Sequence, residues 1–273
     1  MNPVVSIIIV NFQATALIRE CIKALKAARI AVSYEVIVVD NSSRTSGLKL
    51  LLSEQFADVV YLPMASNLGF AAANNAGVRM ARGETVVILN SDITTHPGAI
   101  ESMVQAVQAD PAIGIVAPRL LNPDGSTQQS YFRFYSPFTV LARRTIFGYT
   151  PFGKKLFAKA LMKDMAPDRA ADVDWCLAAC YCVRKAVWEE LGGMDERFFL
   201  YFEDIDLARR MWQRGYRVQY VPKVTMTHLY GQGSAGRVGV RTLLNPLTRL
   251  HIESGFRYFF KHGWFSSHKR TNI

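Results

Sequence analysis

VVSIIIV, at residues 4–10, is an apolar run rich in β-branched side chains, which is the composition of a buried strand. Helical spacing of apolar residues follows over 14–29, and a second apolar strand is expected over 34–39. The alternation continues with expected strands at 59–62, 85–89 and 113–117 and expected helices at 46–56, 70–81 and 97–109. Fully apolar strands separated by helices indicate a parallel sheet that helices cover on both faces. The sequence therefore predicts an α/β fold with a mostly parallel central sheet.

Polar side chains follow four of these strands, at the point where each strand ends. They are Asn11, Asp40, Asn67 and the group Asn90-Ser91-Asp92. The carboxyl ends of parallel strands meet at one edge of a sheet, and the ligands of such sheets bind there. We therefore expect these residues to line one crevice.

The regular alternation of expected strands and helices ends after residue 117. A basic and aromatic insertion is expected over 136–168, packed over the crevice. Further strands are expected at 173–183 and 216–221, and further helices at 185–191, 203–215 and about 243–261. The predicted organisation is one catalytic domain over 1–230, with halves 1–117 and 118–230, and then a flexible loop and a basic aromatic helix within 231–273.

The composition is that of a globular protein, since half of the 273 residues are hydrophobic. No apolar run approaches the ~20 residues of a membrane-spanning helix, and the start of the chain is too short and too strand-like for a signal peptide. The four cysteines form no CxxC pair, so we expect reduced thiols in the core. These features predict a cytoplasmic protein.

The formal net charge of +10 is distributed unevenly along the chain. From residue 209 to the end there are twelve Lys and Arg residues and a single acid, Glu253, whereas the two signs almost cancel before that point. Such an excess predicts a surface for anionic lipid, a phosphorylated acceptor or nucleic acid. The alternative is a solvated basic helix face.

FFLYFEDID, at residues 198–206, places three carboxylates directly after an apolar and aromatic run. Carboxylates beside a buried segment are costly to desolvate, so a chemical use is expected. The alternative is that acids in the first turn of a helix interact favourably with its dipole. Asp204 shares a helix face with Leu207, Ala208 and Met211, so we expect it on the core side, with Glu203 beside it.

Asp92 and His228 are the predicted metal ligands. Asp92 stands in a D-x-D-like position whose first acid is replaced by Asn90, and a carboxylate there can hold a divalent cation against a diphosphate. His228 could supply a nitrogen ligand to the same ion. The alternatives are that Asp92 caps the following helix and that His228 is a structural histidine.

The crevice has the residue types of a nucleotide site. Asp40, with Asn41 and Ser42, suits a nucleoside base or ribose, and its alternative role is to cap a loop. The segment 67–77 is a helix start rich in small residues, including Gly69 and Asn75, where backbone N–H groups could approach a nucleotide. Neither GxxxxGK[ST] nor GxGxxG is present, which argues against an NTPase and a dehydrogenase.

Six motifs, taken in order, resemble the family 2 inverting glycosyltransferases with a GT-A fold, and most of all their bacterial rhamnosyltransferase-like members. They are SIIIVNF (6–12), VVDNSS (38–43), NLGFA (67–71), LNSD (89–92), GGMDERFF (192–199) and FEDIDL (202–207). The resemblance extends from about Val4 to His228. Each motif is weak alone, but the ordered set is specific.

The resemblance implies a nucleoside diphosphate sugar as donor, with dTDP or UDP as the nucleotide. Its expected binding residues are Asn11, Asp40, Asn67, Gly69, Asn75, Asn90, Ser91 and Asp92. Mg²⁺ or Mn²⁺ would bind at Asp92, with His228 as a further ligand, and Asp204 would be the catalytic base. Glu203 and Trp175 are expected to contact the acceptor. Asn90 departs from the family pattern and leaves the metal fewer protein ligands.

The implied reaction is a single displacement that transfers a sugar, first of all rhamnose from dTDP-rhamnose, to a saccharide hydroxyl. We expect a polyprenyl-diphosphate-linked acceptor for cell-surface polysaccharide, at an anionic membrane surface on the inner face of the cell membrane. The last helix has the aromatic and basic composition of an interfacial anchor, although the same pattern fits core packing or a dimer interface. The alternatives are a transferase of hexose or N-acetylhexosamine from a UDP-sugar, and a scaffold without turnover.

Two other classes of protein fit the sequence less well. A nucleic-acid-binding module would use the basic C-terminal segment, but no recognition motif appears, so no nucleic acid is expected as a partner. A nucleotidyltransferase would need a Gly-rich loop with Lys and Arg after its first strand. The chain lacks such a loop.

Overall fold

A nine-stranded sheet forms the centre of the computed structural model, which describes residues 2–42, 47–144, 146–229 and 245–264. The strands follow the order β3 (Val60–Pro63), β2 (Tyr34–Asp40), β1 (Val5–Asn11), β4 (Thr85–Asn90), β10 (Cys180–Arg184), β6 (Ile113–Leu121), β11 (Arg217–His228) and β5 (Ile93–Thr95), and β8 (Ala171–Asp172) pairs with β11.

Most of the sheet is parallel, as predicted. The first four strands in this order pair in parallel, and so do β6 and β11. The inserted strand β10 is antiparallel to both of its neighbours, and β5 is antiparallel to β11. The sheet therefore has one edge where β1, β2 and β4 all end.

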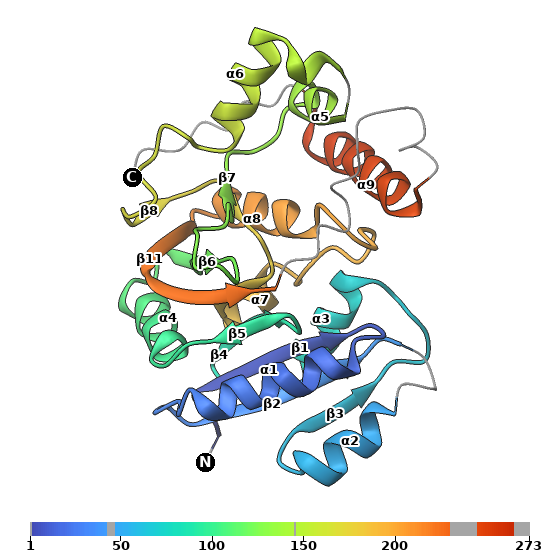
Figure 1. Cartoon of the computed structure of the whole chain (residues 1–273), viewed down its shortest axis with the longest axis vertical. Helices are drawn as coiled ribbons and strands as arrows, with labels where there is room; N and C mark the ends of the chain where they lie inside the picture. Colours follow the sequence, from blue (N-terminus) through green and yellow to red (C-terminus); the bar gives the residue numbers. More distant parts are fainter. Residues whose placement is uncertain (1, 43–46, 145, 230–244, 265–273) are drawn as a thin grey trace.

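Both faces of the sheet are covered by helices (Figure 1). Side chains alternate along β1, so that Ile7 and Ile9 pack with α1 (Thr15–Ala27), α2 (Leu48–Gln55) and α4 (Ala99–Ala109). Ile8 belongs to the opposite core, with α3 (Phe70–Met80), α7 (Lys185–Glu190) and α8 (Glu203–Gln213). This two-sided burial explains why the strands are almost continuously apolar.

The insertion predicted over 136–168 contains helices that the sequence analysis did not assign. They are α5 (Pro137–Arg144), the 3₁₀ turn η1 (Ile146–Tyr149) and α6 (Pro151–Ala160). The side chain of Thr150 caps α6 by accepting a hydrogen bond from the Gly153 N–H, at 3.1 Å. Together α5 and α6 form one end of the molecule, opposite α1 and α2 (Figure 1).

We predicted a C-terminal basic helical appendage to the domain, with core packing as an alternative, and the last helix, α9 (Pro246–His262), packs on the core. Tyr258 is completely buried and Phe259 is 5% exposed, and both belong to the same core as α8. The helix is therefore part of the same packed domain. The predicted flexible loop over 231–239 lies outside the described residues.

The predicted strand over 173–183 is two strands. Trp175–Cys176 is β9, which pairs with β7 (Tyr131–Phe132) in a separate two-stranded sheet, and Cys180–Arg184 is β10. All four cysteines are buried free thiols, as expected. Along the described residues, no helix is both long and apolar enough to cross a membrane.

Many of the described basic residues after residue 208 are paired with acids. Five of the eight basic residues described there form ion pairs, most of them with acids from earlier in the chain: Arg210, Arg214, Arg217, Arg257 and Lys261. Ion pairs therefore offset much of the excess in this part of the chain. The other four basic residues lie outside the described residues, so the predicted surface stays a prediction: Arg237, Arg241, Lys269 and Arg270.

Candidate active site

The predicted crevice residues meet at one edge of the sheet. Asn11 pairs in register with Asp40 at the ends of β1 and β2, and Val10 pairs with Asn90 at the end of β4. The next residues, Ser91 and Asp92, leave the sheet half-buried. The topology therefore brings three predicted segments together.

Asp40 is held in a fixed orientation. It is 5% exposed, and its two carboxylate oxygens accept hydrogen bonds from Asn11 Nδ2 at 2.9 Å and from the Tyr61 hydroxyl at 3.0 Å. Burial and the nearby Asp40 raise the pKa of Tyr61 to about 12, so this hydroxyl remains a donor. Beside these residues is a cavity of about 440 Å³, in the size class of small-ligand sites, lined by Asp40, Gly47, Lys49, Tyr61, Pro63, Met64 and Ala65.

Asn41 connects the end of β2 to the turn before α3. Its side-chain amide donates to Asn67 Oδ1 at 2.9 Å and to the Gly69 carbonyl at 3.2 Å, and its Oδ1 accepts from the Leu68 N–H at 3.0 Å. Asn67 and Gly69 therefore belong to the same edge as Asp40.

Gly69 is at a close approach between two segments. Its φ is +89°, and a Cβ there would lie 2.3 Å from the Phe199 carbonyl oxygen, so only glycine fits. The same oxygen accepts a hydrogen bond from the Phe70 N–H at 2.8 Å. This contact brings the segment before Glu203 and Asp204 to the start of α3.

Asn75 makes its polar contacts away from the other predicted nucleotide residues. Its amide donates to the Met194 carbonyl at 2.8 Å and to Glu196 Oε1 at 3.0 Å, and its Oδ1 accepts from the Met194 N–H at 2.9 Å. The side chain thus ties α3 to the 194–196 turn, and we no longer assign it to the nucleotide.

Asp92 and His228 lie together, as predicted for metal ligands. Strand β5, which the sequence analysis missed, pairs with β11 so that His228 is opposite Ile93. As a result His228 Nε2 lies 3.3 Å from Asp92 Oδ1. Two donor atoms of one octahedral ion, each at ~2.1 Å, are ~3 Å apart, so this spacing suits a shared cation.

Gln128 fixes the tautomer of His228 and was not predicted. Its Oε1 lies 2.7 Å from His228 Nδ1, while its own amide donates to Asn122 Oδ1 at 3.0 Å. The Gln128 oxygen therefore accepts from an Nδ1–H, which makes Nε2 the nitrogen with the lone pair toward Asp92.

The donor set is small. Within the described ranges, no three His, Cys, Asp or Glu side chains are grouped closely enough to hold a metal ion. One carboxylate and one imidazole fit an ion that takes its remaining ligands from diphosphate oxygens and water.

Asp204 has the environment of a base, but it does not lie on the core side of its helix, where we predicted it. It is half-buried at the start of α8, whereas its neighbour Glu203 is only 5% exposed. Burial raises the pKa of Asp204 to about 6, against the opposing effect of hydrogen bonds from the Ile205 and Ala178 backbone N–H groups. The helix face was misassigned because the turn before α8 sets its rotation.

Glu203 is too deeply buried both for the predicted contact with the acceptor and for the role of base. Its Oε2 has no hydrogen-bond partner among the described residues. Burial, and then the charge of Asp204, hold the pKa of Glu203 well above its ordinary value. Burial therefore favours the neutral form of the Glu203 carboxyl group.

A short backbone segment connects Asp204 to the candidate metal ligands. The Ala178 N–H bonds the Asp204 carboxylate, and the Ala179 carbonyl accepts from the Asn90 N–H at 2.8 Å. Asp204 and the Asn90-Ser91-Asp92 group thus flank residues 178–179 on either side. The geometry brings a base and a candidate cation site into one region.

Trp175 packs in the interior, in place of the predicted acceptor contact. It is 4% exposed, it stacks on Phe132 with ring centres 4.4 Å apart, and its indole N–H donates to the Arg133 carbonyl at 3.0 Å. Neither the ring face nor the N–H remains for an acceptor, so this assignment is withdrawn.

Comparison with known proteins shows similarity to glycosyltransferases. Residues 6–164 match the sequence profile described as Glycosyl transferase family 2. The N-acetylglucosaminyl-diphospho-decaprenol L-rhamnosyltransferase of Mycobacterium tuberculosis is 27% identical over 253 residues, which are 87% of this chain and 79% of that protein. Rhamnosyltransferase WbbL of Escherichia coli (strain K12) is 25% identical over 233 residues, 82% of this chain and 81% of its own.

The fold is also similar to that of a solved structure. The crystal structure of GalNAc-T7 with UDP, GalNAc and Mn²⁺ superimposes with a TM-score of 0.66 and 16% sequence identity. The match covers 98% of this chain and 51% of that one, so the chain spans about half of the GalNAc-T7 structure.

Proposed function

Because the chain belongs to glycosyl transferase family 2 and has the GT-A fold, we propose that this glycosyltransferase moves rhamnose from dTDP-rhamnose to a polyprenyl-diphosphate-linked saccharide. Two relatives that are named as rhamnosyltransferases, one of them for a decaprenol-linked acceptor, support this choice. The product would serve cell-surface polysaccharide synthesis.

The observation that carries the proposal is the position of Asp204. A half-buried carboxylate with a pKa of about 6 is largely ionised at neutral pH and still basic enough to take a proton. Asp204 would accept the proton of the acceptor hydroxyl while that oxygen bonds to the anomeric carbon. The bond from this carbon to the nucleoside diphosphate breaks in the same step, which inverts the anomeric centre.

The donor would bind along the sheet edge. Asp40, oriented by Asn11 and Tyr61, would contact the nucleoside, whose base would enter the adjoining cavity. Asp92 and His228 would hold Mg²⁺ or Mn²⁺, and a nitrogen ligand disfavours Mg²⁺, which takes oxygen ligands. When bound, the ion would offset the charge that develops on the departing diphosphate.

A lipid-linked acceptor requires the enzyme to reach a membrane, and the helical insertion has a suitable surface. Tyr149 is 67% exposed and Phe152 is 64% exposed, next to Lys154 and Lys155, which form no ion pair with any described residue. The segment 136–163 contains six basic residues and no acid. Exposed aromatic rings with unpaired lysines are typical of an interfacial contact with anionic lipid.

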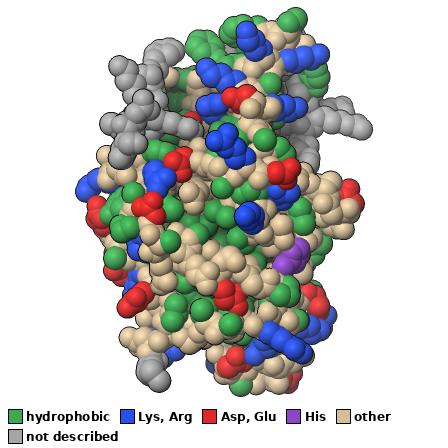
Figure 2. All heavy atoms as spheres, turned by 90° about the vertical axis from the view of Figure 1, so that its left-hand side faces the viewer, with side chains coloured by type: hydrophobic (Ala, Val, Ile, Leu, Met, Phe, Trp, Pro, Cys, Tyr) green, Lys and Arg blue, Asp and Glu red, His purple; other side chains and the backbone are tan. Residues whose placement is uncertain are grey.

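The same end of the molecule is recognisable in the space-filling view. Lys and Arg side chains gather among hydrophobic ones at the upper end in Figure 2, which α5 and α6 form in Figure 1. We therefore assign peripheral membrane contact to the α5–α6 insertion, in place of the last helix.

A thermal-shift screen tests the donor. The melting temperature is measured with dTDP-rhamnose, UDP-glucose, UDP-N-acetylglucosamine and GDP-mannose, each with Mn²⁺ and with EDTA. A ligand that binds only the native state raises the melting temperature. We expect the largest shift for dTDP-rhamnose with Mn²⁺. A larger shift with a UDP-sugar would instead make the enzyme a hexose or N-acetylhexosamine transferase.

A further inference from the structure

The turn that presents Asp204 has an unusual backbone. Tyr201 and Phe202 have φ angles of 70° and 69°, so two consecutive bulky residues adopt the left-handed conformation just before Glu203. Residues with side chains of this size rarely adopt it, and they keep it only where the surrounding structure enforces it. The contacts around this turn therefore determine where α8 begins.

Helix α9 packs against the side chain of Phe202, which is 2% exposed. The ring lies 5.2 Å from the His251 ring and 5.5 Å from the Tyr258 ring, measured between centroids. A Cβ on Gly255 would lie 3.3 Å from Phe202 Cζ, so the helix backbone approaches the ring closely. One face of α9 thus forms the pocket for Phe202.

The same helix also holds the backbone of the turn. Ser254 Oγ donates to the Leu200 carbonyl at 2.9 Å, and the Arg257 guanidinium donates to the Arg197 carbonyl. Two side chains of α9 therefore hold the backbone of the turn, at residues 197 and 200.

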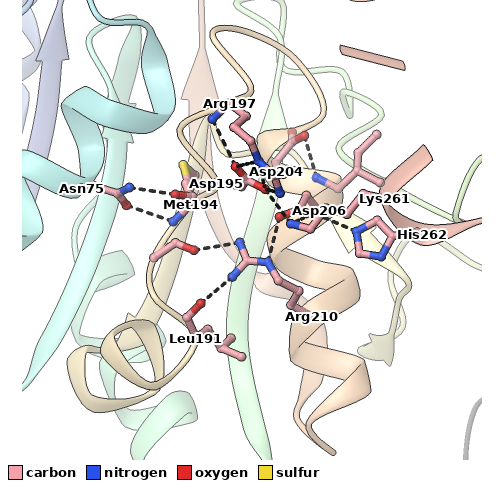
Figure 3. A network of polar contacts seen from close by, with 12 residues as sticks. Asn75, Leu191, Met194, Asp195, Arg197, Asp204, Asp206, Arg210, Lys261 and His262 are labelled. Carbon is pink, nitrogen blue, oxygen red and sulfur yellow. Dashed lines mark hydrogen bonds and ion pairs between the residues drawn. The ribbon is translucent and has the colours of Figure 1, made fainter. Parts of the chain in front are cut away.

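Asp206, on the first turn of α8, makes the third contact with α9 (Figure 3). It is completely buried, and it bonds Lys261 Nζ at 2.6 Å, His262 Nε2 at 2.7 Å and Arg210 Nε at 2.8 Å. Burial alone would raise the pKa of Asp206, but the hydrogen bond from His262 and the charges of Arg210 and Lys261 outweigh it and lower the pKa. The carboxylate is thus ionised and tied to the end of α9.

We propose that α9 is a positioning element for the catalytic base, acting through Phe202, Ser254 and the Asp206 pair with Lys261 and His262. It holds the left-handed turn, and the turn fixes the direction of Asp204 two residues before Asp206. This inference rests on the proposed role of Asp204 as base. Asp206 is therefore a positioning residue and not one of a catalytic group of three acids.

The test breaks the contacts between α9 and Asp206 with substitutions at the end of α9, away from the proposed donor site. Lys261→Met combined with His262→Leu removes both α9 contacts to Asp206, whereas His262→Gln keeps an N–H donor at the position of Nε2. Three quantities are measured on the full chain: the amide hydrogen exchange of residues 198–206, the affinity for dTDP with Mn²⁺, and kcat and KM for rhamnosyl transfer.

We expect faster exchange over 198–206 in the double variant, with exchange over 85–90 and dTDP affinity unchanged. Because a small misplacement of a catalytic group is costly, kcat should fall by about 10²-fold while the donor KM changes little. His262→Gln should retain most of the activity. The control is Met103→Ala, a core substitution in α4, compared with the double variant at an equal loss of melting temperature.

Two results would overturn the proposal: unchanged exchange over 198–206, or a loss of kcat no larger than that of Met103→Ala. If the wild type transfers no rhamnose to any acceptor, the proposed function is wrong, but the exchange measurement still decides whether α9 fixes the turn. The two failures are therefore distinguishable.

Discussion

His228 Nε2 lies 3.3 Å from Asp92 Oδ1, although one residue ends β11 and the other follows β4. The short strand β5 connects them, since it follows Asp92 directly and pairs with the end of β11. The β11–β5 pairing thus builds the candidate cation site.

Loss of either ligand should weaken metal-dependent binding of the nucleotide. Asp92→Asn should remove the difference between dTDP binding in Mn²⁺ and in EDTA, because the remaining imidazole is a single protein ligand. His228→Ala should reduce the same difference to a smaller extent. Isothermal titration calorimetry measures it, and equal Mn²⁺ dependence in wild type and Asp92→Asn would show that the ion binds elsewhere.

Gln128 should matter for the metal without touching it. Gln128→Leu removes the acceptor for His228 Nδ1–H and should weaken Mn²⁺ affinity by about 10- to 100-fold, which is typical of residues that orient a ligand. Gln128→Glu keeps an acceptor and should retain the affinity. If both variants bind Mn²⁺ as the wild type does, the tautomer of His228 is set by something else.

The rate of transfer should have an acid limb near pH 6. Asp204 accepts a proton only when it is ionised, and its pKa is raised to about 6 by burial, so kcat should rise with pH through that value and level off above it. The profile is measured at saturating donor and acceptor. A rate that stays constant down to pH 4 would be incompatible with Asp204 as the base.

The sequence predicted the sheet and its polar edge because apolar strand runs and the residues after them are local signals. Strands β5, β7 and β8 have only two or three residues each, too few for any periodicity to appear. Gln128 reaches His228 because its N–H bonds the Leu120 carbonyl of β6, which pairs with the end of β11, so no motif in the sequence could have revealed that contact.

Two other predictions were wrong for the same reason, which is that residues close in sequence can have side chains that point in different directions. The left-handed turn at Tyr201 and Phe202 rotates α8, so that Glu203 is buried and Asp204 is half-buried, the reverse of the predicted arrangement. Similarly, Lys261 points inward to Asp195 and Asp206 and is not part of a basic surface.

Membrane binding should depend on the insertion. Each lysine near an anionic surface contributes about 1 kcal/mol that salt screens, so Lys154→Glu with Lys155→Glu should abolish sedimentation with phosphatidylglycerol vesicles. Arg19→Glu with Lys23→Glu changes the net charge equally on α1, at the other end of the molecule (Figure 1), and should bind as the wild type does. Equal loss in both variants, or equal binding to phosphatidylcholine vesicles, would contradict the assigned surface.

Glu203→Gln provides the comparison for the base. Burial raises the pKa of Glu203 and favours its neutral form, so an amide of the same shape should leave most of the transfer activity. Initial rates with dTDP-rhamnose measure it. A larger loss in Glu203→Gln than in Asp204→Asn would exchange the two roles.

The central claim is tested most directly by rhamnosyl transfer in wild type and Asp204→Asn. The rate is measured with dTDP-rhamnose, Mn²⁺ and polyprenyl-diphosphate-linked N-acetylglucosamine. Burial raises the pKa of Asp204, so its ionised form destabilises the fold above that pKa, and the variant should melt no lower than the wild type at pH 8. We predict that kcat falls by about 10²-fold or more while dTDP affinity is unchanged. Equal kcat in the two proteins would contradict the account.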